Sequence, residues 1–175
     1  MGLVSAPVAL VLRTASPDET RALAGVVARA CRPGDVLLLA GDLGSGKTTF
    51  AQGFGAGLGV TEPITSPTFT LVRQYPLGGD GSVRTLLHAD VWRLEHLHEI
   101  VDLGLGEVVD DGAVALVEWG DAAEPVLGAD ALTVELTADG EGDDVRVITV
   151  RPAGGPWLTR WDDLATALDH WVVAS

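Results

Sequence analysis

One glycine-rich segment constrains the fold of this 175-residue chain more than any other feature of its sequence. The segment matches the pattern G-x-x-x-x-G-K-[ST] with the residues Gly41-Asp42-Leu43-Gly44-Ser45-Gly46-Lys47-Thr48. The apolar run Val36 to Ala40 precedes it and suits a strand covered on both faces, and Thr48 to Leu58 can form a helix after it. A strand, this loop and a helix in that order predict a phosphate-binding loop (P-loop).

The residue types of the loop suit the binding of a triphosphate. Glycines let successive backbone N–H groups turn inward around the phosphates, and the N-terminus of the helix adds partial positive charge. We expect Lys47 to reach the β- and γ-phosphates and the Thr48 hydroxyl to ligate Mg²⁺. Thr49 either contacts the α-phosphate or only belongs to the first helical turn. The expected nucleotide-binding residues are Asp42, Leu43, Gly44, Ser45, Gly46, Lys47, Thr48 and Thr49.

Two acidic residues follow apolar runs that are typical of buried strands. Glu118 comes directly after the run 113–117, and Asp90 follows the run 83–87. Carboxylates at the ends of strands beside a P-loop hold the metal ion of the nucleotide, so both are candidate Mg²⁺ ligands and catalytic residues. The sequence leaves open which of the two dominates. His88 either donates a hydrogen bond to a phosphate or a carboxylate, or ends its strand with a locally satisfied ring.

The remaining segments indicate an α/β fold. Ser16, Pro17 and Glu19 predict the start of a helix that continues to about Cys31. Turn residues between strand-like segments predict two antiparallel hairpins. The predicted strands outside the P-loop unit are Val8 to Leu12, Phe69 to Tyr75, Val83 to Leu87, Ala113 to Val117, Leu132 to Thr137 and Val145 to Val150.

These elements predict a single P-loop NTPase domain over residues 1–175, with a mainly parallel central sheet, flanking helices and an antiparallel extension. Apolar residues at helical spacing predict one amphipathic helix at about 157–172, closing the domain. Cys31 is the only cysteine, so no disulfide within the chain is possible.

Composition excludes several classes of function. The formal net charge of −14 would repel a phosphate backbone, so no strong direct binding of nucleic acid is expected. No apolar run is long enough to span a membrane, and the segment from Met1 to Leu12 lacks the pattern of a secretory signal, so we expect a cytoplasmic protein. The chain contains no asparagine, so the guanine-reading motif N-K-x-D cannot occur and ATP is favoured over GTP.

Four blocks of the sequence belong together: Gly41 to Thr49, Ser66 to Val72 (S-P-T-F-T-L-V), His88 to Leu94 (H-A-D-V-W-R-L) and Val117 to Asp121 (V-E-W-G-D). In combination they resemble the TsaE family (also called YjeE), the ATPase of bacterial tRNA threonylcarbamoyladenosine biosynthesis. They occur in the order of the family and at compatible spacing between about Ser16 and Asp121. Two positions depart from the family pattern, with Trp92 in place of tyrosine and Asp121 in place of glutamate.

The resemblance implies an ATPase that uses Mg²⁺ and works with the partner proteins TsaB and TsaD in modifying the adenosine beside the tRNA anticodon. It further implies that residues 66–70 form a nucleotide-responsive loop, with Thr68 near the γ-phosphate or its water. Trp119 would pack beside the nucleotide or contact a partner, and Arg93 would pair with a carboxylate or a phosphate. Few arginines lie near the motifs, so we expect slow hydrolysis without partners.

Two other functions remain open from the sequence. A small-molecule P-loop kinase shares this size and loop, but such enzymes add an arginine-bearing lid, and the candidate lid region, Val101 to Gly112, contains no arginine. A nucleotide-gated module that assembles partners without hydrolysis would retain the loop and differ in its need for Glu118.

Overall fold

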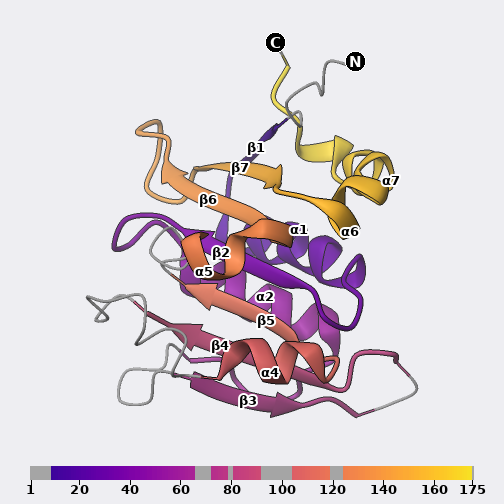
Figure 1. Ribbon diagram of the computed structural model, residues 1–175. Coiled ribbons are helices and arrows are strands. Elements are labelled where there is room, and N and C mark those ends of the chain that lie inside the picture. Colours follow the sequence, from indigo (N-terminus) through magenta and orange to yellow (C-terminus); the bar gives the residue numbers. More distant parts are fainter. Residues whose placement is uncertain (1–8, 66–71, 79–80, 92–103, 119–123, 175) are drawn as a thin grey trace, which may run out of the picture.

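The computed structural model of the chain describes residues 9–65, 72–78, 81–91, 104–118 and 124–174. Within these ranges, strands form one seven-stranded sheet in the order β1-β7-β6-β2-β5-β4-β3 (Figure 1). The strands are β1 (Leu10–Thr14), β2 (Val36–Ala40), β3 (Val72–Pro76), β4 (Thr85–Asp90), β5 (Val114–Glu118), β6 (Leu132–Ala138) and β7 (Arg146–Pro152). The helices are α1 (Pro17–Arg29), α2 (Lys47–Leu58), α4 (Leu105–Asp110), α5 (Glu124–Leu127), α6 (Gly155–Thr159) and α7 (Trp161–Ala167), with the 3₁₀ turns η2 (Gly128–Asp130) and η3 (Asp169–Trp171).

The centre of the sheet is parallel and its margins are antiparallel. β2 pairs in parallel with both β5 and β6, and β4 pairs in parallel with β5. β7 is antiparallel to β6 and to β1, and β3 is antiparallel to β4. The predicted fold class is therefore confirmed, and the two hairpins are β3–β4 and β6–β7.

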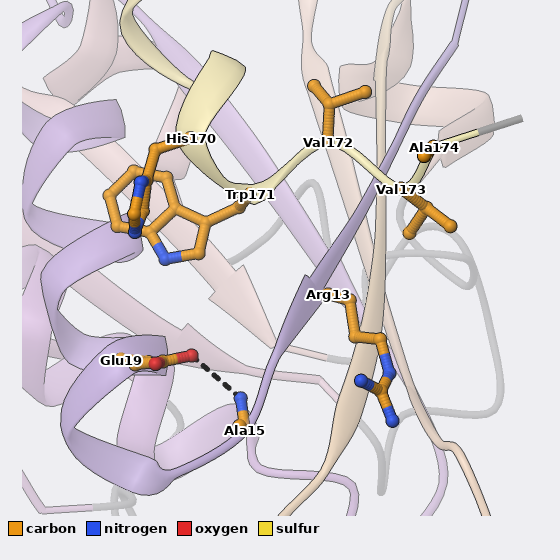
Figure 2. Close-up of a pocket in the computed structure, with 8 residues that line it drawn as sticks. All are labelled: Arg13, Ala15, Glu19, His170, Trp171, Val172, Val173 and Ala174. Atoms are coloured by element: carbon orange, nitrogen blue, oxygen red, sulfur yellow. Dashed lines mark hydrogen bonds between the residues drawn. The ribbon is translucent and has the colours of Figure 1, made fainter.

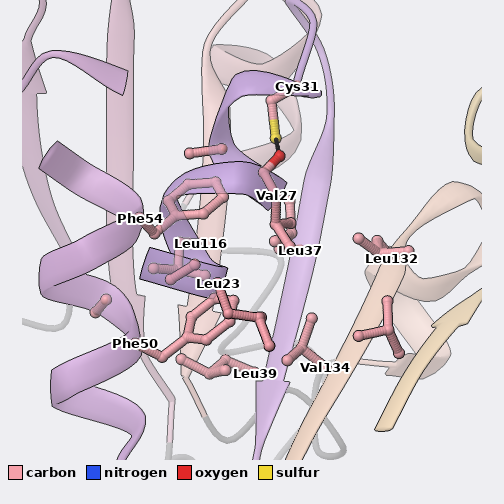
Figure 3. Packing of buried hydrophobic residues seen from close by; sticks show 14 of the residues in the cluster. Leu23, Val27, Cys31, Leu37, Leu39, Phe50, Phe54, Leu116, Leu132 and Val134 are labelled. Atoms are coloured by element: carbon pink, nitrogen blue, oxygen red, sulfur yellow. Dashed lines mark hydrogen bonds between the residues drawn. The ribbon is translucent and has the colours of Figure 1, made fainter. Parts of the chain in front are cut away.

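Strand β2 is apolar throughout because helices cover both faces of the sheet. Leu37 and Leu39 belong to the core cluster that contains α1 and α2, whereas Leu38 belongs to the cluster that contains α4. Side chains alternate between the faces of a strand, so consecutive leucines enter the two cores in turn. Figure 3 shows the first core, where Phe50 and Phe54 of α2 lie against the sheet.

Helix α1 begins where the sequence predicts and is held by its own side chains. The Ser16 hydroxyl accepts a hydrogen bond from the Glu19 N–H (3.2 Å), and the Glu19 carboxylate accepts one from the Ala15 N–H (2.8 Å). Pro17 takes the first helical position, where its missing N–H costs nothing. The local sequence thus fixes this terminus without help from distant residues.

Glycines allow α1 and α2 to pack with their backbones close together. A Cβ atom added at Gly53 would lie 2.4 Å from both Cα and the carbonyl oxygen of Arg21. One added at Gly57 would lie 2.8 Å from Cα of Gly25. The glycines that lower the helix propensity of α2 are therefore the residues that place it against α1.

The C-terminal region differs from the predicted single helix over 157–172. The helix is broken at Arg160 into α6 and α7, and the last turn, η3, is 3₁₀. The cause lies far away in the sequence, because the Arg160 guanidinium donates to both carboxylate oxygens of buried Asp35 (2.8 and 3.0 Å). The Arg160 guanidinium also donates to the carbonyl of Pro156 (3.0 Å) in α6, and Arg160 is the C-cap residue of that helix. Beyond η3, Val173 N–H donates to the Val11 carbonyl at the edge of the sheet.

No helix in the described part of the chain is long and apolar enough to cross a bilayer. Helix α1 has 13 residues, whereas a transmembrane helix needs about 20. Its buried residues lie on the face toward the sheet and α2, as in an ordinary amphipathic helix.

Candidate functional site

The glycine-rich loop connects the carboxyl end of β2 to the first residue of α2. Gly41, Gly44 and Gly46 all have positive φ angles (150°, 79° and 103°), which residues with a Cβ atom rarely adopt. A Cβ at Gly41 would also lie 2.4 Å from the Ser45 hydroxyl oxygen and 2.6 Å from the Leu136 carbonyl oxygen. The loop conformation therefore depends on the two glycines that define the motif, Gly41 and Gly46, and on Gly44 between them.

Helix α2 begins directly at the loop and offers its N-terminus to an anion. Its N-cap residue is Gly46, which has no side chain to satisfy the first N–H groups of the helix. Ser45 is buried, and its hydroxyl has no hydrogen-bond partner among the residues described. Unsatisfied donors at a helix N-terminus are suited to phosphate oxygens.

The Lys47 side chain folds back over the loop. Its Nζ atom donates to the carbonyl of Gly41 (2.6 Å) and to that of Asp42 (2.9 Å), and the residue is 7% exposed. An ammonium group inside the curve of the loop is well placed to meet a phosphate there. Thr48 is exposed at the start of α2 and Thr49 is half-buried, so Thr48 has the more accessible hydroxyl.

The alternation of β4 and β5 brings three polar side chains to the face that α2 covers. Leu86 and Leu116 belong to the core between the sheet and α1–α2. His88 and Asp90 follow Leu86 by two and four residues, and Glu118 follows Leu116 by two, so these side chains share that face. They lie at the carboxyl ends of the parallel strands, the edge from which the loop leaves β2.

The strand register sets the two carboxylates beside each other. Asp90 pairs with Glu118 across β4 and β5, and Glu118 pairs with Leu39 of β2, just before the loop. Asp90 is 5% exposed and Glu118 is 2% exposed. Two buried carboxylates at adjacent positions of neighbouring strands are oxygen ligands of the kind that Mg²⁺ takes.

His88 lies against Glu118. Its Nε2 atom is 3.2 Å from Glu118 Oε2, and the imidazole is completely buried. The two atoms are close enough for an ionic contact, although their orientation is not that of a hydrogen bond. The histidine therefore packs against the Glu118 carboxylate.

The donor set suits Mg²⁺ bound together with a phosphorylated ligand. Within the described residues, His, Cys, Asp and Glu form no group of three or more that could hold a metal ion by itself. Two carboxylates on adjacent strands and the hydroxyl of Thr48 offer oxygen ligands, and Mg²⁺ commonly completes such a set with phosphate oxygens and water.

Several predicted residues lie outside the described part of the chain. These are Thr68 with the rest of 66–70, Arg93 and Trp119. The candidate kinase lid is described only from residue 104, where it forms α4 and buries Leu105 and Val109 in the second core. Helix α4 therefore packs on the face of the sheet opposite to α1 and α2.

The structure also reveals contacts that the sequence did not predict. Arg146 at the start of β7 donates to the carbonyls of Ser45 (2.7 Å) and Gly44 (3.2 Å) in the loop. No sequence signal identifies this contact, because Arg146 lies 101 positions after Ser45 in the chain. Arg160 and Asp35 form a second such pair.

A separate cavity of about 370 Å³ lies between the start of α1 and the C-terminal segment (Figure 2). Arg13, Glu19 and Trp171 are among the residues that line it. Glu19 is already used in capping α1 through the Ala15 N–H. None of the predicted site residues lines this cavity, so the loop and the two carboxylates remain the candidate site.

The parallel sheet, the glycine loop between β2 and α2, and the flanking carboxylates define the class of the protein. This fold and this loop are those of a nucleotide-binding protein of the P-loop class. The structure is similar to the crystal structure of YdiB from Bacillus subtilis, with a TM-score of 0.70 and 37% sequence identity over 95% of this chain and 97% of that one.

The sequence comparisons identify the family. Residues 14–147 match the family model "Threonylcarbamoyl adenosine biosynthesis protein TsaE". The chain is 43% identical to the tRNA threonylcarbamoyladenosine biosynthesis protein TsaE of Bacillus subtilis, over 87% of this chain and 92% of that protein. It is 42% identical to the protein of the same name from Streptomyces coelicolor, over 79% of this chain and 94% of that protein. The chain belongs to the TsaE family.

Proposed function

We propose that the chain binds ATP with Mg²⁺ and hydrolyses it in support of tRNA threonylcarbamoyladenosine modification. The observation that supports this proposal most is the P-loop from Gly41 to Thr48, together with the buried carboxylates of Asp90 and Glu118, which are paired residues of β4 and β5. The relatives' names supply the pathway, because they are tRNA threonylcarbamoyladenosine biosynthesis proteins. The absence of asparagine from the sequence favours ATP over GTP.

In this proposal the residues of the chain position and stabilise charge. Lys47 leaves the carbonyls of Gly41 and Asp42 and meets the β- and γ-phosphates, while the loop N–H groups surround them. Thr48, Glu118 and Asp90 would hold Mg²⁺, which neutralises charge on the β- and γ-phosphates.

Hydrolysis is an attack by water on the γ-phosphorus, in line with the bond to the β,γ-bridging oxygen. That bond breaks to give ADP and phosphate, and the proton of the water ends on the released phosphate. Glu118 would orient the attacking water and help to hold Mg²⁺, and His88 packs against the Glu118 carboxylate. Thr68 belongs to the proposal as a residue near the γ-phosphate through the family resemblance alone.

The partners in this proposal are those that the family resemblance implies, and the charge of the chain is compatible with them. A chain with a formal net charge of −14 is poorly suited to bind tRNA directly. We therefore propose that it acts by binding protein partners of the TsaB and TsaD type. Among the described arginines, Arg146 donates to loop carbonyls, and we place a further positive group for the transition state on a partner. We expect TsaB and TsaD to raise the rate of ATP hydrolysis.

Substitution of Glu118→Gln tests the proposal. The variant keeps the size of the side chain and should retain ATP binding by calorimetry, because the loop is intact. Phosphate release should fall, and a cell that depends on the variant should lose threonylcarbamoyladenosine from its tRNA, as measured by mass spectrometry of nucleosides. Normal tRNA modification by a variant that binds ATP but does not hydrolyse it would instead support gating by nucleotide binding alone.

A further inference from the structure

The Arg146 side chain ties the P-loop to the hairpin formed by β6 and β7. Its Nε atom donates to the Ser45 carbonyl (2.7 Å) and its Nη2 atom to the Gly44 carbonyl (3.2 Å). Its Nη1 atom donates to the carbonyls of Asp143 (2.7 Å) and Val145 (2.9 Å). One guanidinium group thus contacts two carbonyls of the loop and two of the hairpin with all three of its nitrogens.

These contacts bear on the conformation that a phosphate-binding loop needs. A loop that turns its N–H groups toward an anion must turn carbonyl groups elsewhere, and those carbonyls need donors. Arg146 supplies donors to the carbonyls of Gly44 and Ser45, while Phe50 N–H supplies one to Gly46 within α2. Arginine suits this task because its planar group presents several donors in a fixed arrangement.

Two further carbonyls of the loop accept from Lys47, and the Asp42 carbonyl also accepts from the Ser45 N–H (3.0 Å). Lys47 Nζ holds the carbonyls of Gly41 and Asp42, and it must leave them to meet a phosphate. Arg146 approaches the loop from β7, and its contacts with Gly44 and Ser45 involve carbonyl groups only. These contacts are therefore compatible with both the empty loop and the occupied loop.

We propose that Arg146 is a positioning residue that holds the P-loop in its phosphate-binding conformation and couples the loop to the β6–β7 hairpin. This inference rests on the proposed binding of nucleotide by the loop. Because the loop carbonyls and the hairpin carbonyls share one guanidinium, ordering of the loop by a nucleotide restricts the hairpin as well. Arg146 needs no contact with the nucleotide itself.

Arg151 provides a matched control on the same strand. Its Nη2 atom is 3.4 Å from Glu135 Oε2, and both side chains of this pair are exposed. Arg146→Met and Arg151→Met therefore remove the same group from β7, but only the first removes donors from the loop. Methionine keeps an unbranched apolar side chain, and Arg146→Lys restores a charge without the planar group.

The affinity of each variant for ADP and ATP with Mg²⁺ is measured by calorimetry at a temperature where circular dichroism shows it folded. We expect Arg146→Met to weaken binding about ten- to hundredfold, as for the loss of charge-assisted hydrogen bonds. Arg146→Lys should recover part of the affinity, and Arg151→Met should bind like the unmodified chain. A merely structural role would lower the melting temperature of the folded variant and leave its affinity unchanged, and that result would overturn the proposal.

Hydrogen exchange on the unmodified chain gives a second test that needs no variant. Addition of ADP should slow exchange in the hairpin segment 139–146 as well as in the loop, and unchanged exchange in the hairpin would refute the coupling. Failure of the unmodified chain to bind any nucleotide would instead refute the proposed function and this inference with it. Normal binding by the unmodified chain and by Arg146→Met would refute the inference alone.

Discussion

Replacement of Gly53 by alanine sets two physical effects against each other in the helix that begins at the P-loop. Helix propensity alone predicts a gain of about 1 kcal/mol, because glycine is the poorer helix former. The added Cβ would lie 2.4 Å from Cα and from the carbonyl oxygen of Arg21, both of which are backbone atoms of α1. A backbone neighbour cannot rotate away, so the two helices must separate.

The clash should outweigh the gain in propensity. Overpacking in a core costs about 1–3 kcal/mol, and the backbone contact places Gly53→Ala at the upper end, at about 3 kcal/mol. Subtraction of the gain of about 1 kcal/mol leaves a net loss of about 2 kcal/mol. For a domain of this size, that loss lowers the melting temperature by about 4–8 °C.

Urea denaturation followed by circular dichroism measures this loss as a lower midpoint with an unchanged slope. Gly106→Ala is the matched control, because Gly106 lies in α4 and an added Cβ would have no neighbour within 4 Å. That variant should be as stable as the unmodified chain or more stable by up to about 1 kcal/mol. A Gly53→Ala protein that is equally or more stable would refute the close backbone packing of α1 and α2.

Two further predictions concern the C-terminal region and the cysteine. Asp35→Ala leaves the buried guanidinium of Arg160 without its carboxylate and should lower the free energy of unfolding by about 3–5 kcal/mol, as measured by urea denaturation. Removal of the exposed Arg151 should lower it by less than about 1 kcal/mol. Equal losses in the two variants would contradict a larger contribution from the buried pair. Burial, with a smaller contribution from Asp35, raises the pKa of the Cys31 thiol well above its ordinary value, so the thiolate fraction is reduced at any given pH below that pKa. The thiol should react with a disulfide reagent at pH 8 only after denaturant is added, and rapid reaction in the folded protein would contradict its buried placement.

The parts of the fold that sequence reasoning predicted depend on local chemistry. The run Val36 to Ala40 forms β2 with the predicted bounds, and the α1 start follows from the Ser16 and Glu19 side chains. The central parallel strands and the β6–β7 hairpin also match the expected α/β arrangement. For β2, the start of α1 and the β6–β7 hairpin, the determining residues lie close together in the chain, whereas the parallel pairing of the central strands joins distant segments.

The parts that the sequence could not predict depend on residues that meet only in the folded chain. The expected single C-terminal helix is broken because Arg160 binds Asp35, which lies 125 positions earlier. The contact of Arg146 with the loop likewise requires β7 to lie beside β6, which is itself the neighbour of β2 in the sheet. The roles of Thr68 and Trp119 stay predictions, because these residues lie outside the described ranges.

The most direct test of the site is calorimetric titration of ATP with Mg²⁺ into the unmodified chain and into Lys47→Ala. The unmodified chain should bind one nucleotide, because the loop, the helix N-terminus and the lysine all face the same phosphates. Lys47→Ala should stay folded by circular dichroism and bind about a hundredfold more weakly or not at all, since a buried ammonium group has been removed from the loop. Equal affinity of the folded variant and the unmodified chain would contradict the assignment of Gly41 to Thr48 as the phosphate-binding loop.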